Sequence, residues 1–183
     1  MAEFFVRRPI VAIVIAILTV IVGTVTLFTL PTSQYPDIVP PEIHGSVLIS
    51  AGDLSGCEWP SSRLNPYTAF QPLKPDEMID YGVLVYHGSF PMNQAAALSR
   101  AQRVYELMRA HELDEALAMA REAVAIDPVE IISQTALGDI AAALGQKDEA
   151  RQAWQAAIAS ARQLEPDAQV SYIPDLEDKL KRL

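Results

Sequence analysis

The segment from Ile10 to Leu30 constrains the chain most, because it holds 21 consecutive residues without a charged side chain. A helix of this length rises roughly 30 Å, the thickness of the hydrocarbon core of a bilayer. The sequence therefore predicts one transmembrane helix at 10–30, after a short cytoplasmic start at 1–9. A cleaved secretory signal is the alternative, but the run is longer than a typical signal core and no small-residue cleavage site follows it.

Flanking cations set the expected orientation of this helix. Arg7 and Arg8 precede the apolar run, whereas the next cation after it is Arg63. Because basic flanks stay in the cytoplasm, we expect the N-terminus to be cytoplasmic and the body to lie on the far side of the membrane.

The charge and the motif content of the chain exclude several classes of function. A net charge of −9 over 183 residues repels phosphates, so nucleic acid is not expected as a partner. The histidines have no cysteine or carboxylate at ligand spacing, and no glycine-rich phosphate loop is present. We expect no metal, no cofactor and no catalytic residue, and hence no enzyme. Cys57 ends a lipobox-like Leu-Ser-Gly-Cys, but it lies too far behind the apolar run, so we expect an unmodified loop thiol.

The opening of the chain carries four short motifs, Arg8-Pro9, Leu30-Pro31, Gln34-Tyr35-Pro36 and Pro40-Pro41. On these motifs, residues 1–43 resemble the start of resistance-nodulation-division efflux pumps of the hydrophobe/amphiphile exporter type. The resemblance implies a bacterial inner membrane, with the lipid bilayer as a partner, and a proline-rich linker at 31–45 that leads into the periplasm. Such pumps need many more spans and a proton relay, so the resemblance does not imply pumping.

The segment 46–92 has a strand-and-loop texture. Two short strands are expected at 46–50 and 82–86, separated by a stretch with four prolines. The runs VLISAGDLSGCEW, NPYTAF and KPDEMIDYGVLVYHGSF make residues 46–90 similar to the periplasmic tail of protein-mannosyltransferase-like membrane glycosyltransferases. No catalytic residue of that family has a counterpart here, so the resemblance implies only a compartment outside the cytoplasm.

From Asn93 the chain consists mainly of strong helix formers. Ala116 and Ala150 each follow an acidic pair and lie 34 residues apart, which is the tetratricopeptide period. We expect helices near 94–110, 113–126, 130–144 and 147–164, and a closing helix at 175–182 inside a capping segment at 167–183.

On this period, residues 95–166 resemble a tetratricopeptide (TPR) repeat protein with two repeats in a domain at 93–166. The resemblance implies packing roles for nine residues: Ala116, Ala123, Pro128, Leu137, Gly138, Gly145, Ala150, Trp154 and Ala157. It departs from the family at Val104, where a small residue is expected, and at Pro166, which comes four residues late. It also implies a concave groove for a protein or peptide partner, lined by Arg100, Arg103, Gln134 and Ala141.

The expected fold class is mainly α, with one N-terminal transmembrane helix, a small β/loop segment and a two-repeat TPR-like antiparallel stack with a closing helix. The expected function is a single-pass, membrane-anchored, periplasmic protein–protein interaction scaffold. The alternative is a non-autonomous fusion or fragment. It would join an efflux-transporter start to a membrane-glycosyltransferase tail and have no independent activity.

Overall fold

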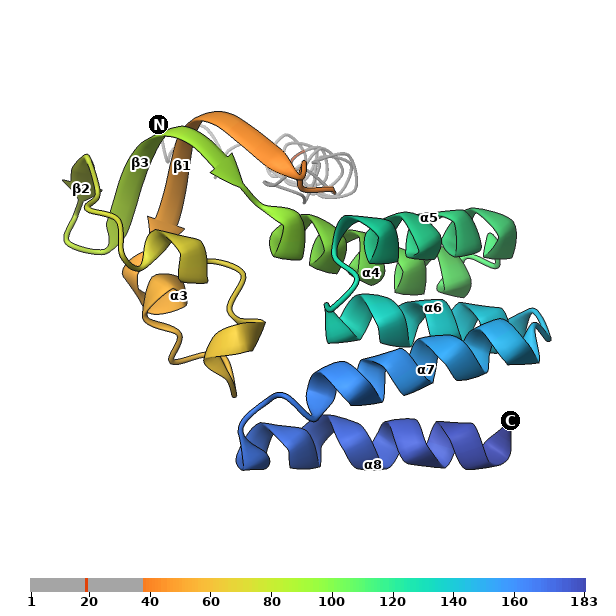
Figure 1. The fold of residues 1–183 in the computed structure, drawn as a ribbon. Helices are drawn as coiled ribbons and strands as arrows, with labels where there is room; N and C mark the ends of the chain where they lie inside the picture. The colour runs from red at the N-terminus through yellow and green to blue at the C-terminus, as the bar shows by residue number, and fades with distance from the viewer. Residues whose placement is uncertain (1–18, 20–37) are drawn as a thin grey trace, which may run out of the picture. The chain divides into compact units, whose positions relative to one another are not determined.

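The computed structural model describes Thr19 and residues 38–183 (Figure 1). The chain divides into two compact units, Met1–Pro36 and Asp37–Leu183, and the described elements belong to the second. This unit begins with a small sheet and continues as five helices, α4 to α8.

Three antiparallel strands form the sheet, in the order β1-β3-β2. Strand β1 spans Glu42–Ser50, β2 spans Glu77–Ile79 and β3 spans Val83–Pro91. Side chains alternate between the two faces of a strand, so Val47 and Ile49 are buried whereas Leu48 between them is 58% exposed. Strand β2 was not predicted from the sequence, because three residues are too few to show this alternation.

A small aromatic core lies under the sheet. The ring centroid of Phe70 lies 5.1 Å from that of Tyr86 and 4.9 Å from that of Phe90. Phe70 lies in the connection between β1 and β2. This connection contains helix α3 (Ala51–Ser55) and two single 3₁₀ turns, Ser62–Leu64 and Thr68–Phe70.

The helices follow one another as antiparallel neighbours (Figure 1). Their bounds are α4 Asn93–Arg109, α5 Leu113–Ile126, α6 Ile131–Ala143, α7 Lys147–Ala161 and α8 Pro166–Arg182. Alanine dominates the buried positions of α5 and α7, and small side chains let helix axes approach closely. Glu130 caps α6 by accepting hydrogen bonds from the backbone N–H groups of Ile132 and Ser133.

The residues expected to pack the repeats have different surroundings. The side chain of Trp154 is 4% exposed and covers Gly138, and Gly145 adopts a φ of 74° in the turn before α7. Leu137 is half-buried, and Pro128 lies exposed in the turn between α5 and α6. The remaining four are fully buried: Ala116, Ala123, Ala150 and Ala157.

Helix α8 is about twice as long as the expected closing helix at 175–182. Pro166 occupies its first turn, where the missing N–H costs no hydrogen bond and the fixed φ suits a helix. Pro174 lies inside the helix on its exposed side. The first proline therefore begins α8 and does not mark a late end of α7.

The expected fold class is wrong in the form given above. The described chain is helical with a small three-stranded sheet. Among Thr19 and residues 38–183, every helix is either too short or too polar to cross a bilayer. The expected transmembrane helix at 10–30 lies outside the described residues, apart from Thr19, so the structure shows no N-terminal transmembrane helix.

Candidate protein-interaction surface

Arg100, one of the four expected groove residues, is buried and makes three hydrogen bonds within the chain through Nε and Nη1. Its Nε donates a 2.9 Å hydrogen bond to Glu122 on α5. Its Nη1 donates to the carbonyl oxygen of Val39 at 2.8 Å and to that of Ala96 at 3.1 Å. Arg100 thus connects α4 to α5 and to the segment that enters β1.

The other three expected groove residues differ in their exposure. Arg103 is partly exposed and forms an ion pair with Glu106 at 2.7 Å. Gln134 is buried and donates to the carbonyl oxygen of Pro128, and Ala141 has no exposed surface. Only Arg103 has a side chain that solvent reaches to a large extent, and a partner groove lined by these four residues stays a prediction.

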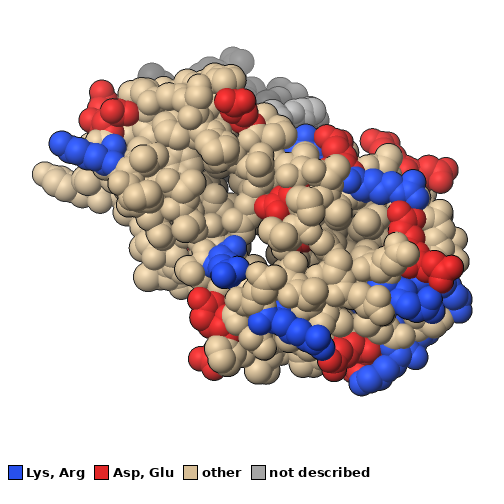
Figure 2. Space-filling model, viewed as in Figure 1, with Lys and Arg blue, Asp and Glu red and all other residues tan. Residues whose placement is uncertain are grey.

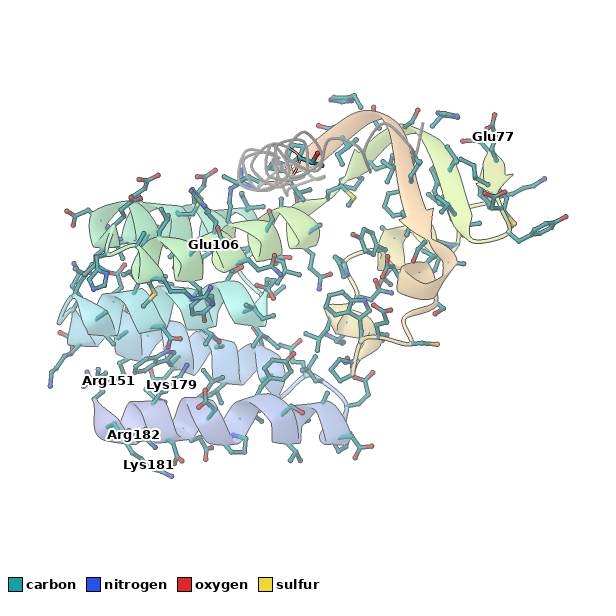
Figure 3. The ribbon with its side chains drawn as sticks, turned by 180° about the vertical axis from the view of Figure 1, so that it is seen from behind. Glu77, Glu106, Arg151, Lys179, Lys181 and Arg182 are labelled. Carbon is teal, nitrogen blue, oxygen red and sulfur yellow. The ribbon has the colours of Figure 1, made fainter. Side chains whose placement is uncertain are left out.

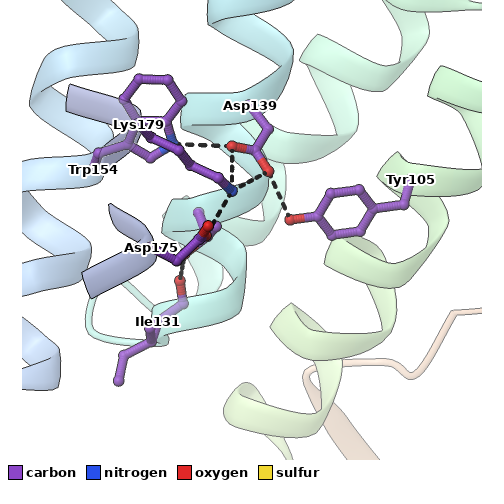
Figure 4. A network of polar contacts seen from close by, with 7 residues as sticks. Tyr105, Ile131, Asp139, Trp154, Asp175 and Lys179 are labelled. Carbon is purple, nitrogen blue, oxygen red and sulfur yellow. Dashed lines mark hydrogen bonds and ion pairs between the residues drawn. The ribbon is translucent and has the colours of Figure 1, made fainter. Parts of the chain in front are cut away.

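A different set of side chains meets around Asp139 of α6 (Figure 4). Lys179 of α8 lies 2.9 Å and 3.0 Å from its two carboxylate oxygens. Tyr105 of α4 donates its hydroxyl to Oδ2 at 3.2 Å, and Trp154 of α7 donates its indole N–H to Oδ1 at 3.1 Å. One carboxylate therefore joins four helices, and Asp175 contacts Lys179 at 3.3 Å from within α8.

Two members of this cluster are separated by the 34-residue period seen in the sequence. Tyr105 and Asp139 lie 34 residues apart, so they hold equivalent places on α4 and α6. This spacing is the one sequence signal that could have pointed to the pair. Lys179 could not have been found in this way, because it belongs to the closing helix outside the repeats.

Burial and charge shift the pKa values of the cluster. Burial, and next the charge of Asp139, raise the pKa of the Tyr105 phenol. Burial by itself would lower the pKa of Lys179, but the hydrogen bond to Asp139 and the two nearby carboxylates outweigh it, so the pKa is raised. At neutral pH Lys179 is a cation and Tyr105 is a neutral donor.

Basic side chains cluster near the C-terminal end of α8. Figure 3 shows Arg151, Lys179, Lys181 and Arg182 at this end of α7 and α8, and Figure 2 shows Lys and Arg there alternating with Asp and Glu. A cavity of about 370 Å³ opens beside them. It is lined by Ala142, Lys147, Trp154, Lys179, Arg182 and Leu183.

The histidines and acids form no metal centre in the part that the structure describes. His44 and His87 each contact a serine across β1 and β3 at 2.7 Å, Ser89 and Ser46 respectively. Within residues 38–183, no group of three His, Cys, Asp or Glu side chains is placed to hold a metal ion.

A family model described as the AcrB/AcrD/AcrF family matches residues 1–52. The match confirms the resemblance of the opening segment to efflux transporters of this type and extends it through β1. It covers less than a third of the chain, so it describes the opening segment and not the helices.

Curated relatives match the same segment. The multidrug export protein AcrF of Escherichia coli K12 is 43% identical over 53 residues, which are 29% of this chain and 5% of AcrF. The toluene efflux pump membrane transporter TtgB of Pseudomonas putida is 49% identical over 43 residues, 24% of this chain and 4% of TtgB. The chain spans about a twentieth of the length of these relatives. No solved structure matches it.

Proposed function

We propose that this chain is a composite protein in which the opening segment of an efflux-type transporter is joined to a helical body that binds another protein. The opening segment is supported by the family match over residues 1–52. The same match favours a chain without transport activity of its own, because it corresponds to about a twentieth of a whole transporter. The proposal includes an origin of residues 46–90 in the periplasmic tail of a protein-mannosyltransferase-like glycosyltransferase. It does not include sugar transfer by this chain.

The observation that carries protein binding is the pairing of Tyr105 and Asp139. These side chains hold equivalent places on the first helices of the two repeats and touch at 3.2 Å. Tyr105 is partly buried and keeps part of its ring at the surface of α4, whereas Asp139 is contacted by Lys179 and Trp154 as well. Aromatic side chains with a polar end are frequent at protein interfaces. We propose a TPR-like fold for residues 95–166 on the basis of this pattern and the 34-residue period.

Site-specific photo-crosslinking in cells tests this surface. A benzoylphenylalanine at Met108, one turn beyond Tyr105 on α4, is expected to give a discrete adduct of higher mass. The matched control is Ala118, an exposed position on α5. Adducts at both positions, or at neither, would count against a specific surface on α4 and α6.

We propose further that the chain resides at the bacterial inner membrane with its body in the periplasm. Support comes from the relatives, since TtgB is named a membrane transporter. Fractionation with an antibody against residues 95–183 tests this. A full-length band in the inner-membrane fraction that external protease digests is expected, and a soluble cytoplasmic band would overturn the proposal.

A further inference from the structure

Strand β1 forms one edge of the sheet. In the part of the chain that the structure describes, β1 has β3 on one side and no strand on the other, which we call its outer edge (Figure 1). Proteins commonly protect such edges with a short strand, a lysine or a proline, because unpaired backbone groups readily bind another strand. The opposite edge, β2, has only three residues, whereas β1 has nine and contains neither lysine nor proline. Strand β1 is therefore the edge of this sheet that can accept a further strand.

Hydrogen bonds at the two ends of the ladder show which backbone groups of β1 face the outer edge. Just before the strand, the N–H of Met92 donates to the carbonyl of Pro41 at 2.7 Å. Just after it, the N–H of Ala51 donates to the carbonyl of Gly82 at 2.8 Å. Bonded residues alternate along an antiparallel pair, and the register of β1 with β3 is continuous between these ends. Odd-numbered residues of β1 therefore bond to β3, and even-numbered residues direct their N–H and C=O groups to the outer edge.

The side chains of β1 also suit a continuation of the sheet. Val47 and Ile49 face the aromatic core and are 8% and 2% exposed, and Ile43 packs against the same core. On the other face, Leu48 is 58% exposed although it is aliphatic. The strand holds one carboxylate, Glu42, at its first position. No acidic side chain therefore lies in the middle of the edge, where it would repel a second strand.

We infer that the outer edge of β1 binds the same edge of a second copy of this chain, which joins two three-stranded sheets into one continuous sheet. A two-fold axis through Ser46 makes the two copies of β1 antiparallel and overlaps all nine residues of the strand. Even-numbered residues then lie opposite even-numbered residues, so the outward N–H and C=O groups of both copies are paired. Glu42 lies opposite Ser50 of the second copy, which keeps the two carboxylates apart.

The side chains match in this register as well. On the core face, Ile43 lies opposite Ile49 of the second copy, so the apolar layer under one sheet continues into the next. On the other face, Leu48 lies opposite His44 and loses part of its exposed surface. A register shifted by one residue would pair outward groups with groups that already bond to β3, and would exchange the two faces. The interface lies in the sheet and is independent of the protein binding proposed for α4 and α6.

Disulfide trapping tests both the dimer and its register, on the purified full chain with Cys57 replaced by serine. Opposed residues of a hydrogen-bonded pair have Cα atoms about 5.5 Å apart, which a disulfide can span. Ser46→Cys lies opposite itself on the two-fold axis and is expected to give a covalent dimer on mild oxidation. His44→Cys is the matched control on the same face of β1. Its two copies would lie more than about 13 Å apart along the paired strands, so it is expected to give no dimer.

Sedimentation equilibrium measures the same association without cysteines. Leu48→Lys is expected to weaken dimerisation at least about tenfold, because a lysine on an edge strand opposes pairing. Val170→Lys places the same charge at an exposed valine of α8 and is expected to change the affinity less than about twofold. The net charge of −9 repels a second copy, so dimerisation of the wild-type chain should strengthen as the salt concentration rises.

Three results would overturn the inference. Equal trapping through Ser46→Cys and His44→Cys would mean that the chains associate through another part or in no fixed register. Equal effects of Leu48→Lys and Val170→Lys would reduce the interaction to general charge. A disulfide adduct of Ser46→Cys with a different protein in cells, in place of the dimer, would exclude a second copy as the strand that binds this edge.

Discussion

The indole ring of Trp154 lies directly on Gly138, where α7 crosses α6. A β-carbon at residue 138 would lie only 2.3 Å from Cδ1 and Nε1 of this ring. The ring cannot move aside freely, because it is buried and its N–H is hydrogen-bonded to Asp139 at 3.1 Å. The contact fixes both the spacing of two helices and the position of the carboxylate that joins four of them.

Gly138→Ala is expected to destabilise the folded chain by about 2 kcal/mol or more, because the added carbon overpacks the crossing and displaces the indole. Chemical denaturation followed by circular dichroism measures the loss. Gly52→Ala is the matched control, since a β-carbon there meets nothing closer than 3.6 Å. Wild-type stability in Gly138→Ala would mean that the crossing is loosely packed.

The ion pair of Asp139 and Lys179 is expected to hold α8 to α6. Their side chains are 18% and 28% exposed, so solvent screens them only partly. A double-mutant cycle with Asp139→Asn and Lys179→Met is expected to give a coupling energy of about 1 kcal/mol or more. The exposed pair Asp178 and Lys181 serves as control and is expected to show no measurable coupling. A coupling energy no larger than that of the control would show that this ion pair does not hold α8 to α6.

Alkaline pH is expected to destabilise the fold through Tyr105. Burial and Asp139 raise the pKa of its phenol above the ordinary 10.0, so the unfolded chain loses this proton at lower pH than the folded chain does. The unfolded state then binds fewer protons, and stability falls as pH rises above about 10, by at most about 1.4 kcal/mol per pH unit for one proton.

The raised pKa of Lys179 acts in the same direction, because the folded chain also retains this proton longer. Tyr105→Phe should therefore flatten the alkaline loss in denaturation curves without removing it. Tyr81→Phe changes a phenol that is 95% exposed and should leave the wild-type slope. An unchanged slope in Tyr105→Phe would contradict the burial of the phenol against Asp139.

Arg100 is expected to act as a tether and not as a partner-binding residue. Its hydrogen bond to the carbonyl of Val39 lies beside a second contact, in which the backbone N–H of Val39 donates to Ser99 at 3.0 Å. Arg100→Lys cannot keep the geometry toward both Val39 and Glu122. Hydrogen exchange at Val39 should accelerate about tenfold, which corresponds to about 1.4 kcal/mol of local stability.

Arg109→Lys is the matched control for the tether, because Arg109 is an exposed cation in the last turn of α4. It should leave exchange at Val39 unchanged. If Arg100→Lys leaves exchange at Val39 unchanged but weakens the crosslink at Met108, the expected role of Arg100 in a partner groove would be supported instead.

The sequence predicted the helices well, because helix formation depends mainly on residues close together in the chain. Runs of helix formers and the 34-residue spacing placed four helices within a few residues of α4 to α7. The motifs around Arg8-Pro9 and Gln34-Tyr35-Pro36 identified the transporter-like opening that the family match supports. Strand β2 and the true start of α8 were missed, because three residues show no period and a proline can either end or begin a helix.

The sequence by itself determined what depends on near neighbours: the helical texture from Asn93, the acidic charge and the identity of the opening segment. The tertiary structure decided which side chains meet. Lys179 reaches Asp139 across 40 residues, and Arg100 reaches Val39 across 61. No periodicity records such contacts, because they arise from how α8 and the entry to β1 pack on the helices. The same packing buries Gln134 and Ala141.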